Sequence, residues 1–480
     1  MPQPIKLYNT MSRKLEEFKP LVPGQVSFYS CGPTVYWHQH LGNMRTFIHN
    51  DLIKRMFIAN EYKVTHVMNY TDVGHLTSDA DTGDDKMEKG AKRENKSVWD
   101  IAKIYINSVE SDMKDLNILP PTFTPRATDY IKEQIELIKK LEELGYTYII
   151  PGKGVYYDTS KFADYGALSG QDLSKLRSGI RIDDVGKKNP TDFMLWAFSP
   201  KDSKREMEWD SPWGRGFPGW HIECSAMSMK LLGNHFDIHT AAQEHINIHH
   251  TNEIAQSEPI TGKPWVNYWV HFAWLMAKDG KMSKSAGDSL TVPLLKSKGY
   301  DPMEFRYLML LGHYRSPVEF SWKALDAAAA GYKNIVKKVA GLLGSCVSPL
   351  LGGSVAKGDE GGLKEYHDRM LVAVSDNLKT AEAIVIFQEM LRDETLSPAE
   401  KSKLVKFADD LLGLQFMDRA QKLIESENVA IPAEIQKLAD ERVAAKTAKD
   451  WARADELRNQ IDNAGWRIED SKDGMKIIKK

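Results

Sequence analysis

Four residues in two distant parts of the chain are of the types that bind metal ions. Cys31 lies near the N-terminus, whereas Cys224, His249 and Glu253 lie far downstream. His249 and Glu253 are four residues apart, so on a helix their side chains would point the same way. Two thiolates, one imidazole and one carboxylate suit zinc. A lone cysteine is more often a small buried hydrophobe, and an isolated His-x-x-x-Glu pair is more often solvent-facing, so the prediction depends on the combination.

Two other motifs are of the kind that handles nucleotide phosphates. In His40-Leu41-Gly42-Asn43, Gly42 lets a ligand approach the backbone, and a helix beginning there would offer N–H groups to phosphate. In Lys281-Met282-Ser283-Lys284-Ser285, two lysines on a loop are able to stabilise charge that develops on a triphosphate. Either motif alone is a weak signal, but together they predict ATP binding by His40, Gly42, Asn43 and Lys284. The predicted catalytic residues are His40, Lys281 and Lys284.

A metal beside an ATP site suggests that the metal recognises a substrate and that ATP activates it. The candidate substrate-binding residues are Cys31, Thr71 and Trp220. Thr71 is able to donate to a substrate amine or carboxylate, although it is equally an ordinary β-branched strand residue. Trp220 precedes Cys224 by four positions and would lie beside it on a helix, although its ordinary role is that of a core aromatic.

A β-α-β unit would bring the N-terminal candidates together. The sequence predicts a buried strand over residues 25–30, a helix over 43–61 with apolar residues at helical spacing, and a second strand over 63–71. Ligands of such sheets bind beyond the carboxyl ends of the strands. Cys31 and Thr71 are therefore expected at one edge of the sheet.

The rest of the chain predicts an interrupted α/β domain followed by helices. Helices are expected near 97–116 and 126–145, with a β-hairpin over 146–159. The α/β pattern resumes at Gly219 with a helix through Cys224, a strand at 236–239 and a helix that carries His249 and Glu253. After Ser285 the pattern is helical to about residue 465, and a terminal hairpin surrounds a turn at 471–474. The predicted fold class is a Rossmann-like α/β nucleotide-binding domain with an insertion, then an α-helical bundle and a small C-terminal α+β domain.

The composition of the 480 residues is that of a globular protein, with 42% hydrophobic and 27% charged residues. No apolar run is long enough for a signal peptide core or a membrane span. Three cysteines are too few for a disulfide framework, so we expect a reduced, cytoplasmic setting. The net charge of −2 argues against a uniformly basic surface for nucleic acid but leaves room for local basic patches.

Taken together, the motifs resemble those of class I aminoacyl-tRNA synthetases, and specifically cysteinyl-tRNA synthetases. The pair H-x-G-N and K-M-S-K-S is the class I signature. The cysteine-specific resemblance is carried by Cys31-Gly32-Pro33-Thr34-Val35-Tyr36, by the segment 219–227 and by the segment 249–257, and similarity extends from about residue 5 to the end. It implies zinc, one ion per chain, held by Cys31, Cys224, His249 and Glu253. It also implies an ATP contact from Lys284 and recognition of the amino acid by Thr71 and Trp220.

The resemblance further implies a domain order and a set of partners. Residues 1–290 would form the catalytic domain with an insertion at about 75–215, and 291–345 a helical region that contacts the tRNA stem together with the lysine loop. Residues 346–430 would form a helical bundle of the DALR type, and 431–480 an anticodon-binding domain. The expected partners are ATP with Mg²⁺, L-cysteine and tRNA(Cys), with no membrane, and we expect a monomer.

Three segments depart from the usual pattern of these synthetases. Trp37-His38 stands where an Asp-Tyr pair is common. Ala241-Ala242-Gln243-Glu244-His245 replaces a Gly-Gly-x-Asp run, and the acidic loop 78–85 is longer than usual. All four predicted zinc ligands are intact, but contacts made by the usual glycine run cannot be transferred to this chain.

Two alternatives remain open from the sequence. One is a cysteine ligase that uses the same zinc and ATP core but delivers cysteine to an amino-sugar; the long helical C-terminal part argues against it. The other is a catalytically inactive zinc-containing RNA-binding or regulatory module, against which the intact His40, Lys281, Lys284 and metal ligands argue.

Overall fold

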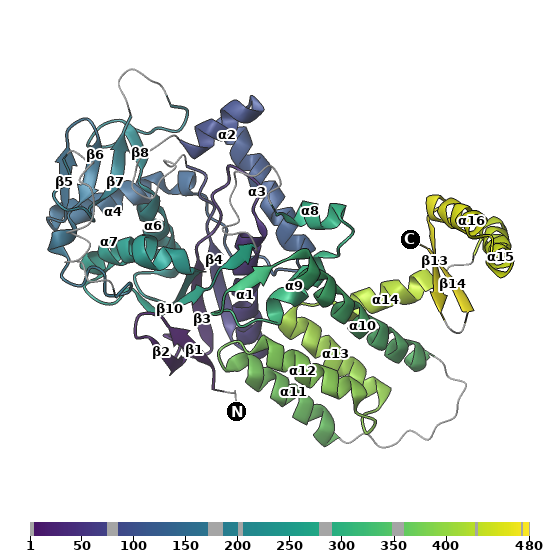
Figure 1. Cartoon of the computed structure of the whole chain (residues 1–480). Helices are drawn as coiled ribbons and strands as arrows, with labels where there is room; N and C mark the ends of the chain where they lie inside the picture. Colours follow the sequence, from purple (N-terminus) through teal and green to yellow (C-terminus); the bar gives the residue numbers. More distant parts are fainter. Residues whose placement is uncertain are drawn as a thin grey trace. The chain divides into compact units, whose positions relative to one another are not determined.

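The computed structural model describes residues 4–73, 85–170, 186–199, 205–277, 290–347, 360–427, 431–471 and 474–479. Most of the acidic loop, the loop with Lys281 and Lys284, and most of the expected linker at 346–362 therefore lie outside the described residues. The chain divides into two compact units (Figure 1). The first contains residues 1–329, 368–386 and 410–414, and the second contains residues 330–367, 387–409 and 415–480.

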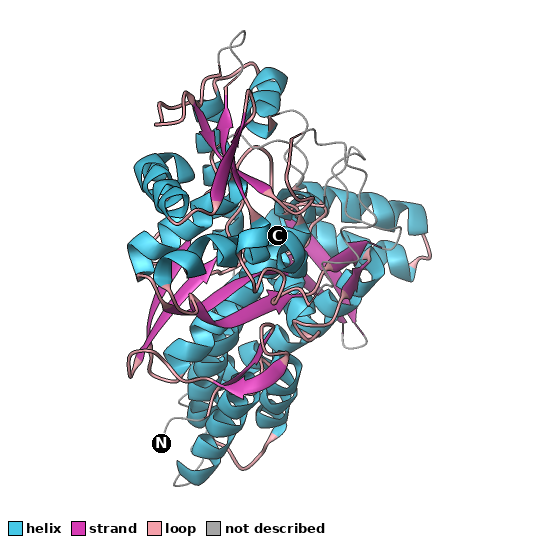
Figure 2. Cartoon of the chain, turned by 90° about the vertical axis from the view of Figure 1, so that its left-hand side faces the viewer, coloured by secondary structure: helices cyan, strands magenta, loops and turns pink. Residues whose placement is uncertain are grey.

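A four-stranded parallel sheet forms the centre of the first unit. The strand order is β10 (Val266–Phe272), β9 (Phe236–Ala242), β3 (Gln25–Ser30) and β4 (Lys63–Met68). The strands are rich in buried apolar residues, as expected for a parallel sheet with helices against it (Figure 2). The predicted α/β fold class is confirmed.

The chain turns in opposite directions from the two central strands. From β3 it passes through helix α1 (Leu41–Ala59) to β4 on one side, and from β9 through helix α7 (Thr251–Thr261) to β10 on the other. The carboxyl ends of β3 and β9 therefore form a topological switch point, where open α/β sheets bind their ligands. Cys31 follows β3 directly at this point.

The helix predicted to carry both His249 and Glu253 is not one regular α-helix. His249 belongs to a π-helical turn, η4 (Ile246–His250), and Glu253 lies in the first turn of α7. A π turn holds one residue more than an α turn and is frequent at functional sites. It follows a short 3₁₀ turn, η3 (Gln243–His245), in the segment where the sequence departs from the usual pattern.

The segment between β4 and helix α6 (Trp220–Leu232) adds helices and a second sheet. The helices are α2 (Lys86–Glu94), α3 (Val98–Asp115) and α4 (Ile131–Glu143), with short 3₁₀ turns η1 (Ala127–Tyr130) and η2 (Thr159–Lys161). The antiparallel sheet has the order β5 (Thr147–Ile150), β6 (Gly154–Tyr157), β7 (Phe193–Phe198) and β8 (Gly216–Pro218). The hairpin predicted at 146–159 is the β5–β6 pair.

Smaller elements complete the first unit. They are the hairpin β1 (Lys6–Asn9) with β2 (Lys14–Glu17), the parallel pair β11 (Leu275–Ala277) with β12 (Val318–Phe320), and helices α8 (Val292–Ser297) and α9 (Pro302–Leu310). Residues 410–414 join this unit because buried Arg306 of α9 donates to the carbonyl of Leu412 at 3.0 Å and pairs with Asp51 of α1.

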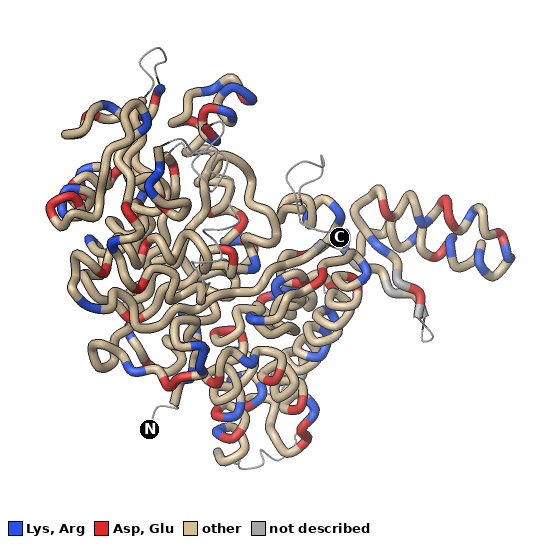
Figure 3. Tube along the Cα trace, turned by 60° about the vertical axis from the view of Figure 1, so that its left-hand side comes forward, with Lys and Arg blue, Asp and Glu red and all other residues tan. Residues whose placement is uncertain are grey.

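The second unit is helical apart from one hairpin. Its helices include parts of α10 (Trp322–Val347), α11 (Glu360–Ser375), α12 (Thr380–Arg392) and α13 (Pro398–Leu412), and all of α14 (Phe416–Glu427). Helices α15 (Ala433–Thr447) and α16 (Trp451–Asn463) pack with the hairpin β13 (Trp466–Ser471) and β14 (Gly474–Lys479) around their own small apolar cluster. Acidic and basic residues are interspersed along α15 and α16 (Figure 3). The domain limits at 290, 345 and 430 stay predictions.

Candidate metal centre and nucleotide pocket

Cys31 is held at the sheet edge by a close approach of two loops. Its amide donates to the carbonyl of Thr240 at 3.1 Å, and the next residue, Gly32, donates to Oδ1 of Asn69 at 2.9 Å. A Cβ atom at Gly32 would lie 1.6 Å from the carbonyl oxygen of Asn69. Only glycine therefore allows the loops after β3 and β4 to meet in this way, which fixes Cys31 against the rest of the site.

The four predicted metal ligands come together. Cys31, Cys224, His249 and Glu253 each offer a ligand atom, and all these atoms lie within 4.8 Å of one another in a fully buried setting. A tetrahedral zinc ion about 2.0–2.3 Å from each ligand would require ligand atoms about 3.3–3.8 Å apart. The donor types and their spacing therefore fit one metal ion, with small adjustments on binding.

The orientation of His249 also fits a metal ligand. Its Nε2 is 2.7 Å from Oε1 of Glu253 but has no hydrogen-bond partner in acceptable geometry. Its Nδ1 lies 2.9 Å from Nδ1 of His221, which fixes the ring in the manner of an outer-shell partner of a metal-binding histidine. Trp220 packs on the same imidazole, with ring centroids 4.4 Å apart.

A second group, Cys31 with His239, His250 and Glu253, also satisfies the distance criterion for a metal site. Here, however, the ring nitrogens that face Glu253 and Cys31 already make hydrogen bonds, unlike Nε2 of His249. Nε2 of His239 is hydrogen-bonded to Oε2 of Glu253 at 2.7 Å, and Nε2 of His250 lies 3.3 Å from Sγ of Cys31. The histidines of this group therefore serve as supporting partners of Glu253 and Cys31, and the group with Cys224 and His249 is the better metal site.

The supporting network continues away from the cluster. Nδ1 of His250 lies 2.9 Å from Nε2 of His271, and Nδ1 of His271 lies 2.8 Å from the hydroxyl of Thr10. Burial lowers the pKa of both histidines well below the ordinary value, so both are neutral at pH 7. This arrangement determines which ring nitrogen of His250 faces Cys31.

The charges of the cluster depend strongly on one another. Burial opposes ionisation of Glu253, but His239 and His249 outweigh it and lower the pKa of that carboxyl to about 2. Burial likewise opposes protonation of His249, but Glu253 and Cys224 raise its pKa to about 10. A hydrogen bond from Cys31 lowers the pKa of Cys224 to about 7, whereas burial raises that of Cys31. The protonation state of each member of the cluster therefore depends on the others.

Thr71 lies next to this cluster and is buried. Its hydroxyl donates to Oε2 of Glu223 at 3.1 Å and accepts from Nδ2 of Asn69 at 3.1 Å. Because Glu223 directly precedes Cys224, the hydroxyl of Thr71 is tied to the helix that supplies a metal ligand. Thr71 and Trp220 are thus beside the candidate metal centre.

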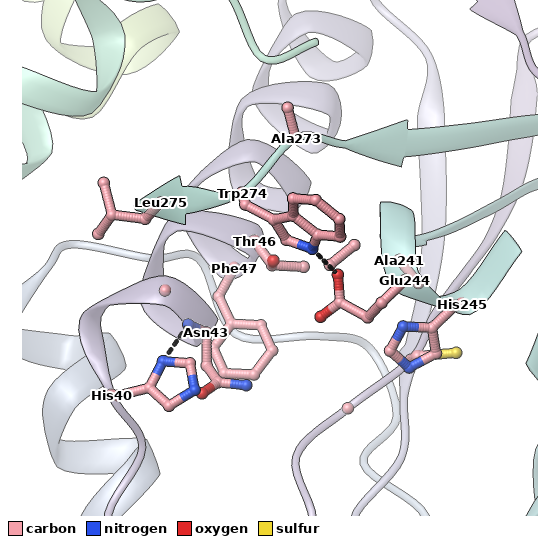
Figure 4. Close-up of a pocket in the computed structure, with 14 residues that line it drawn as sticks. His40, Asn43, Thr46, Phe47, Ala241, Glu244, His245, Ala273, Trp274 and Leu275 are labelled. Carbon is pink, nitrogen blue, oxygen red and sulfur yellow. Dashed lines mark hydrogen bonds between the residues drawn. The ribbon is translucent and has the colours of Figure 1, made fainter. Parts of the chain in front are cut away.

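A cavity of about 130 Å³ extends from Cys31 to the N-terminus of α1 (Figure 4). One wall comes from the start of α1, and the other comes from the ends of β9 and β10. Ligand pockets commonly measure about 300–1,000 Å³, so this cavity is too small to enclose a nucleotide by itself. The lining residues are Cys31, Gly32, His40, Gly42, Asn43, Thr46, Phe47, Ala241, Ala242, Glu244, His245, Ala273, Trp274 and Leu275.

His40 caps helix α1 with its own side chain. The amide of Asn43 donates to Nδ1 of His40 at 3.3 Å, and the helix begins at Leu41. Because Nδ1 accepts this bond, the neutral ring carries its proton on Nε2. The helix N-terminus and this N–H suit an anionic ligand in the cavity.

Arg45 connects the two walls of the cavity. This buried side chain of α1 donates to the carbonyl of Ala273 at 2.7 Å, to the carbonyl of Trp274, and to that of Ser316 at 2.7 Å. Burial lowers the pKa of the guanidinium to about 10, so it stays charged at neutral pH. A single cation thus holds the end of β10 against α1.

Comparison with known proteins shows the family of this chain. The family description "tRNA synthetases class I (C) catalytic domain" matches residues 17–330. A protein of Burkholderia lata named cysteine–tRNA ligase 1 is 43% identical over 476 residues, covering 99% of this chain and 97% of its own. A cysteine–tRNA ligase of Treponema denticola is 41% identical and covers 97% and 98% of the two chains. The chain belongs to the cysteine–tRNA ligase family.

Solved structures agree on the fold of this cysteine–tRNA ligase family member. A methionyl-tRNA synthetase of Mycobacterium tuberculosis, bound by methionyl-adenylate, superposes with a TM-score of 0.59 at 15% identity, covering 85% of this chain and 95% of its own. A LeuRS of Agrobacterium radiobacter K84, in a ternary complex with tRNA and LeuAMS, gives a TM-score of 0.58 at 12% identity over 84% and 85% of the two chains. Within the described residues, no helix is long and apolar enough to span a membrane.

The structure brings together most residues predicted for this site. Cys31, Cys224, His249 and Glu253 form the buried cluster, Thr71 and Trp220 adjoin it, and Cys31, His40, Gly42 and Asn43 line the cavity. Lys281 and Lys284 lie outside the described residues. Their roles in this family member stay predictions.

Several residues of the site were not predicted from the sequence. The supporting histidines His221, His239, His250 and His271 were missed, as were Glu244, Trp274 and Arg45. A compositional signal was present for the histidines, because half of the 14 in the chain lie between residues 221 and 271. No sequence pattern indicated Arg45, whose partners are backbone carbonyls of distant segments.

Proposed function

We propose that the chain activates cysteine with ATP to cysteinyl-adenylate and transfers the cysteinyl group to the 3′-end of tRNA(Cys). The observation that carries this proposal is the buried Cys31, Cys224, His249 and Glu253 cluster, which shares Cys31 with a cavity at the N-terminus of α1. Full-length similarity to cysteine–tRNA ligases supports the same activity.

The cluster would hold zinc, one ion per chain, and would recognise the substrate by its sulfur. When bound, zinc would supply a Lewis acid that favours the thiolate form of cysteine over the much less acidic hydroxyl of serine. His221 and His239 hold the ligands His249 and Glu253 in place. Trp220 and Thr71 would contact the rest of the amino acid, which their positions beside the cluster support.

The start of α1 would take the phosphates. The Nε2–H of His40, the backbone at Gly42 and the side chain of Asn43 would stabilise the α-phosphate when the cysteine carboxylate attacks it and pyrophosphate leaves. Lys281 and Lys284 would add positive charge, and Mg²⁺ would accompany ATP. These assignments come from sequence motifs and from the position of His40 on the cavity.

The helical second unit and the terminal hairpin would contact tRNA. The length of the helical region and its locally basic positions, among them Lys333, Lys337 and Lys338, support this role. We further propose that the protein acts in the cytoplasm and that it is a monomer. Size-exclusion chromatography with light scattering would test the oligomeric state.

The decisive experiment is cysteine-dependent exchange of pyrophosphate into ATP, followed by charging of tRNA(Cys). Exchange and charging are both expected. Exchange without charging of tRNA, but with transfer to an amino-sugar, would favour the cysteine ligase that the sequence left open. Absence of any exchange by the zinc-loaded protein would favour an inactive binding module.

Substitution of Cys224 by serine tests the metal's part. Because serine is a far weaker zinc ligand, Cys224→Ser should lower the bound zinc per chain and raise the KM for cysteine by about tenfold or more, with a smaller effect on the KM for ATP. Metal analysis and exchange kinetics measure both. Cys346→Ser is the matched control, and unchanged zinc and KM in Cys224→Ser would remove this residue from the site.

A further inference from the structure

The segment that departs from the usual family pattern lies on one wall of the cavity. Ala241 and Ala242 at the end of β9, with Glu244 and His245 just after it, line the cavity together with Ala273, Trp274 and Leu275 after β10. This wall faces the start of α1 across the cavity (Figure 4). The departure at residues 241–245 therefore changes the lining of the cavity itself.

Trp274 is the largest side chain of this wall, and its orientation is fixed. Its indole Nε1 donates to Oε2 of Glu244 at 2.6 Å, and its carbonyl accepts from Arg45. The side chain is nevertheless 43% exposed, although it is tied at both ends. A large aromatic ring that is held in place and yet open to solvent is available to a flat ligand.

The position of this ring matches one part of an aminoacyl-adenylate. In the proposed function, the metal cluster binds the sulfur of the aminoacyl group and the start of α1 binds the phosphate. The nucleoside is the one part of the adenylate that has no binding residue assigned to it. A base stacks well on an aromatic ring, and the small side chains of Ala241, Ala242 and Ala273 leave room beside the indole. We propose that Trp274 binds the adenine base of ATP by stacking and that Glu244 is a positioning residue that orients the indole.

This inference rests on the proposed function and adds a residue to it. The test is the KM for ATP in cysteine-dependent pyrophosphate exchange, a reaction that needs no tRNA. Trp274→Ala should raise the KM for ATP about tenfold, a size typical of a lost base–aromatic stack, and leave the KM for cysteine within about twofold. Trp274→Phe keeps a stacking ring but lacks the N–H donor, so a rise of about two- to threefold is expected.

Variants of Glu244 separate orientation from direct contact. Glu244→Gln keeps an oxygen that accepts from the indole, so its KM for ATP should rise less than that of Glu244→Ala. If Glu244 acts through Trp274, the effects of Trp274→Phe and Glu244→Ala should not add in the double variant. Full additivity would overturn the positioning role.

A binding measurement makes the test independent of turnover. Calorimetric titration of the zinc-loaded protein with a non-hydrolysable ATP analogue and Mg²⁺ should show the same loss of about tenfold for Trp274→Ala. Trp99→Ala is the matched control, because Trp99 on α3 is 47% exposed and does not line the cavity. Zinc content and thermal unfolding should match the wild type in all variants.

Three outcomes would overturn the inference. They are an unchanged KM and Kd for the nucleotide in Trp274→Ala, an equal rise in the KM for cysteine, and a defect confined to tRNA charging, which would assign the ring to the terminal adenosine of tRNA. Failure of the proposed function looks different, because the wild-type protein would then lack exchange altogether.

Discussion

The carboxylate of Glu253 shows how single atoms determine what the cluster can bind. One oxygen, Oε1, is 2.7 Å from Nε2 of His249, and the other accepts a hydrogen bond from His239. Because the hydrogen bond to His239 occupies Oε2, Glu253 would bind a metal ion through Oε1 only. One-oxygen binding keeps the coordination number low and leaves space for a substrate sulfur.

His221 should matter for zinc affinity although it is not a ligand. His221→Phe keeps a ring of similar shape but removes the partner of Nδ1 of His249, so zinc should bind about 10–100-fold more weakly. Competition with a chromophoric chelator measures the affinity. His235→Phe is the control, because His235 is only half-buried and its hydrogen bond is to the carbonyl of Pro264, away from the cluster. Equal affinities in the two variants would contradict the role.

Zinc binding should become tighter as the pH rises. At pH 7 the metal-free cluster holds a proton on His249, whose pKa is about 10, and one on Cys31, whose pKa burial raises. Zinc must displace these protons, so its affinity should rise between about tenfold and a hundredfold per pH unit from pH 6 to 8. Calorimetry in buffers of different ionisation enthalpy counts the protons released. An affinity independent of pH would show that the cluster is already deprotonated.

The same raised pKa has a defined effect on the metal-free fold. A histidine whose pKa rises on folding stabilises the folded state fully below its unfolded pKa of about 6.5. That contribution is lost as the pH rises toward the folded value of about 10. Zinc should therefore raise the melting temperature more at pH 8 than at pH 6.

Among the elements, the junction of β3 with β4 positions the most functional groups. The loop after β3 carries Cys31, the loop after β4 carries Asn69 and Thr71, and the two meet at Gly32. Asn69 bonds to Gly32 and to Thr71, so one amide side chain aligns both loops. The position of Cys31 relative to Thr71 therefore depends on this contact.

Gly32→Ala should destabilise the fold and the metal site together. The added Cβ cannot fit 1.6 Å from the carbonyl oxygen of Asn69, so the loops must separate, at a cost of about 1–3 kcal/mol in the free energy of unfolding. Chemical denaturation and zinc content measure the two effects. Gly341→Ala in α10 is the control, because its Cβ meets no atom within 4 Å and should be neutral or stabilising. A stable, zinc-loaded Gly32→Ala protein would refute the argument.

The elements also show what the sequence could and could not predict. Periodicity placed β3, α1, β4 and the β5–β6 hairpin, because each has a local pattern of buried residues. It did not predict the π turn at 246–250, since a segment of five residues is too short for its helical period to be read from the apolar pattern. It also missed the hydrogen bonds of Arg45. Their acceptors are backbone carbonyls, which every residue has, so no residue type in the sequence marks them. The grouping of Cys31, Cys224, His249 and Glu253 was predictable because these side chains carry metal-binding chemistry themselves.

For the molecule as a whole, the division into two units suggests separate tasks. The four candidate metal ligands and the cavity belong entirely to the first unit. Residues 431–479 of the second unit have an apolar cluster of their own, with Trp466 and Ile468 of β13 among its members. Activation of cysteine should therefore depend little on this terminal part.

Removal of residues 431–480 should separate the two half-reactions. Pyrophosphate exchange should stay within about twofold of the full chain, whereas kcat/KM for tRNA(Cys) should fall by on the order of tenfold or more, because positive charges that are proposed to contact the tRNA are lost. Parallel assays of exchange and charging on one preparation provide the comparison. Loss of exchange together with charging would show that the terminal part supports the catalytic fold.

Arg45 also limits how this wall of the cavity can vary. Its guanidinium ties the end of β10 to α1 through backbone atoms, so no substitution of the side chains at 273 and 274 removes the tie. The backbone frame of the cavity is therefore independent of the residue types at these two positions. A preference among nucleotides would have to come from the side chains that line the cavity, while their frame stays the same.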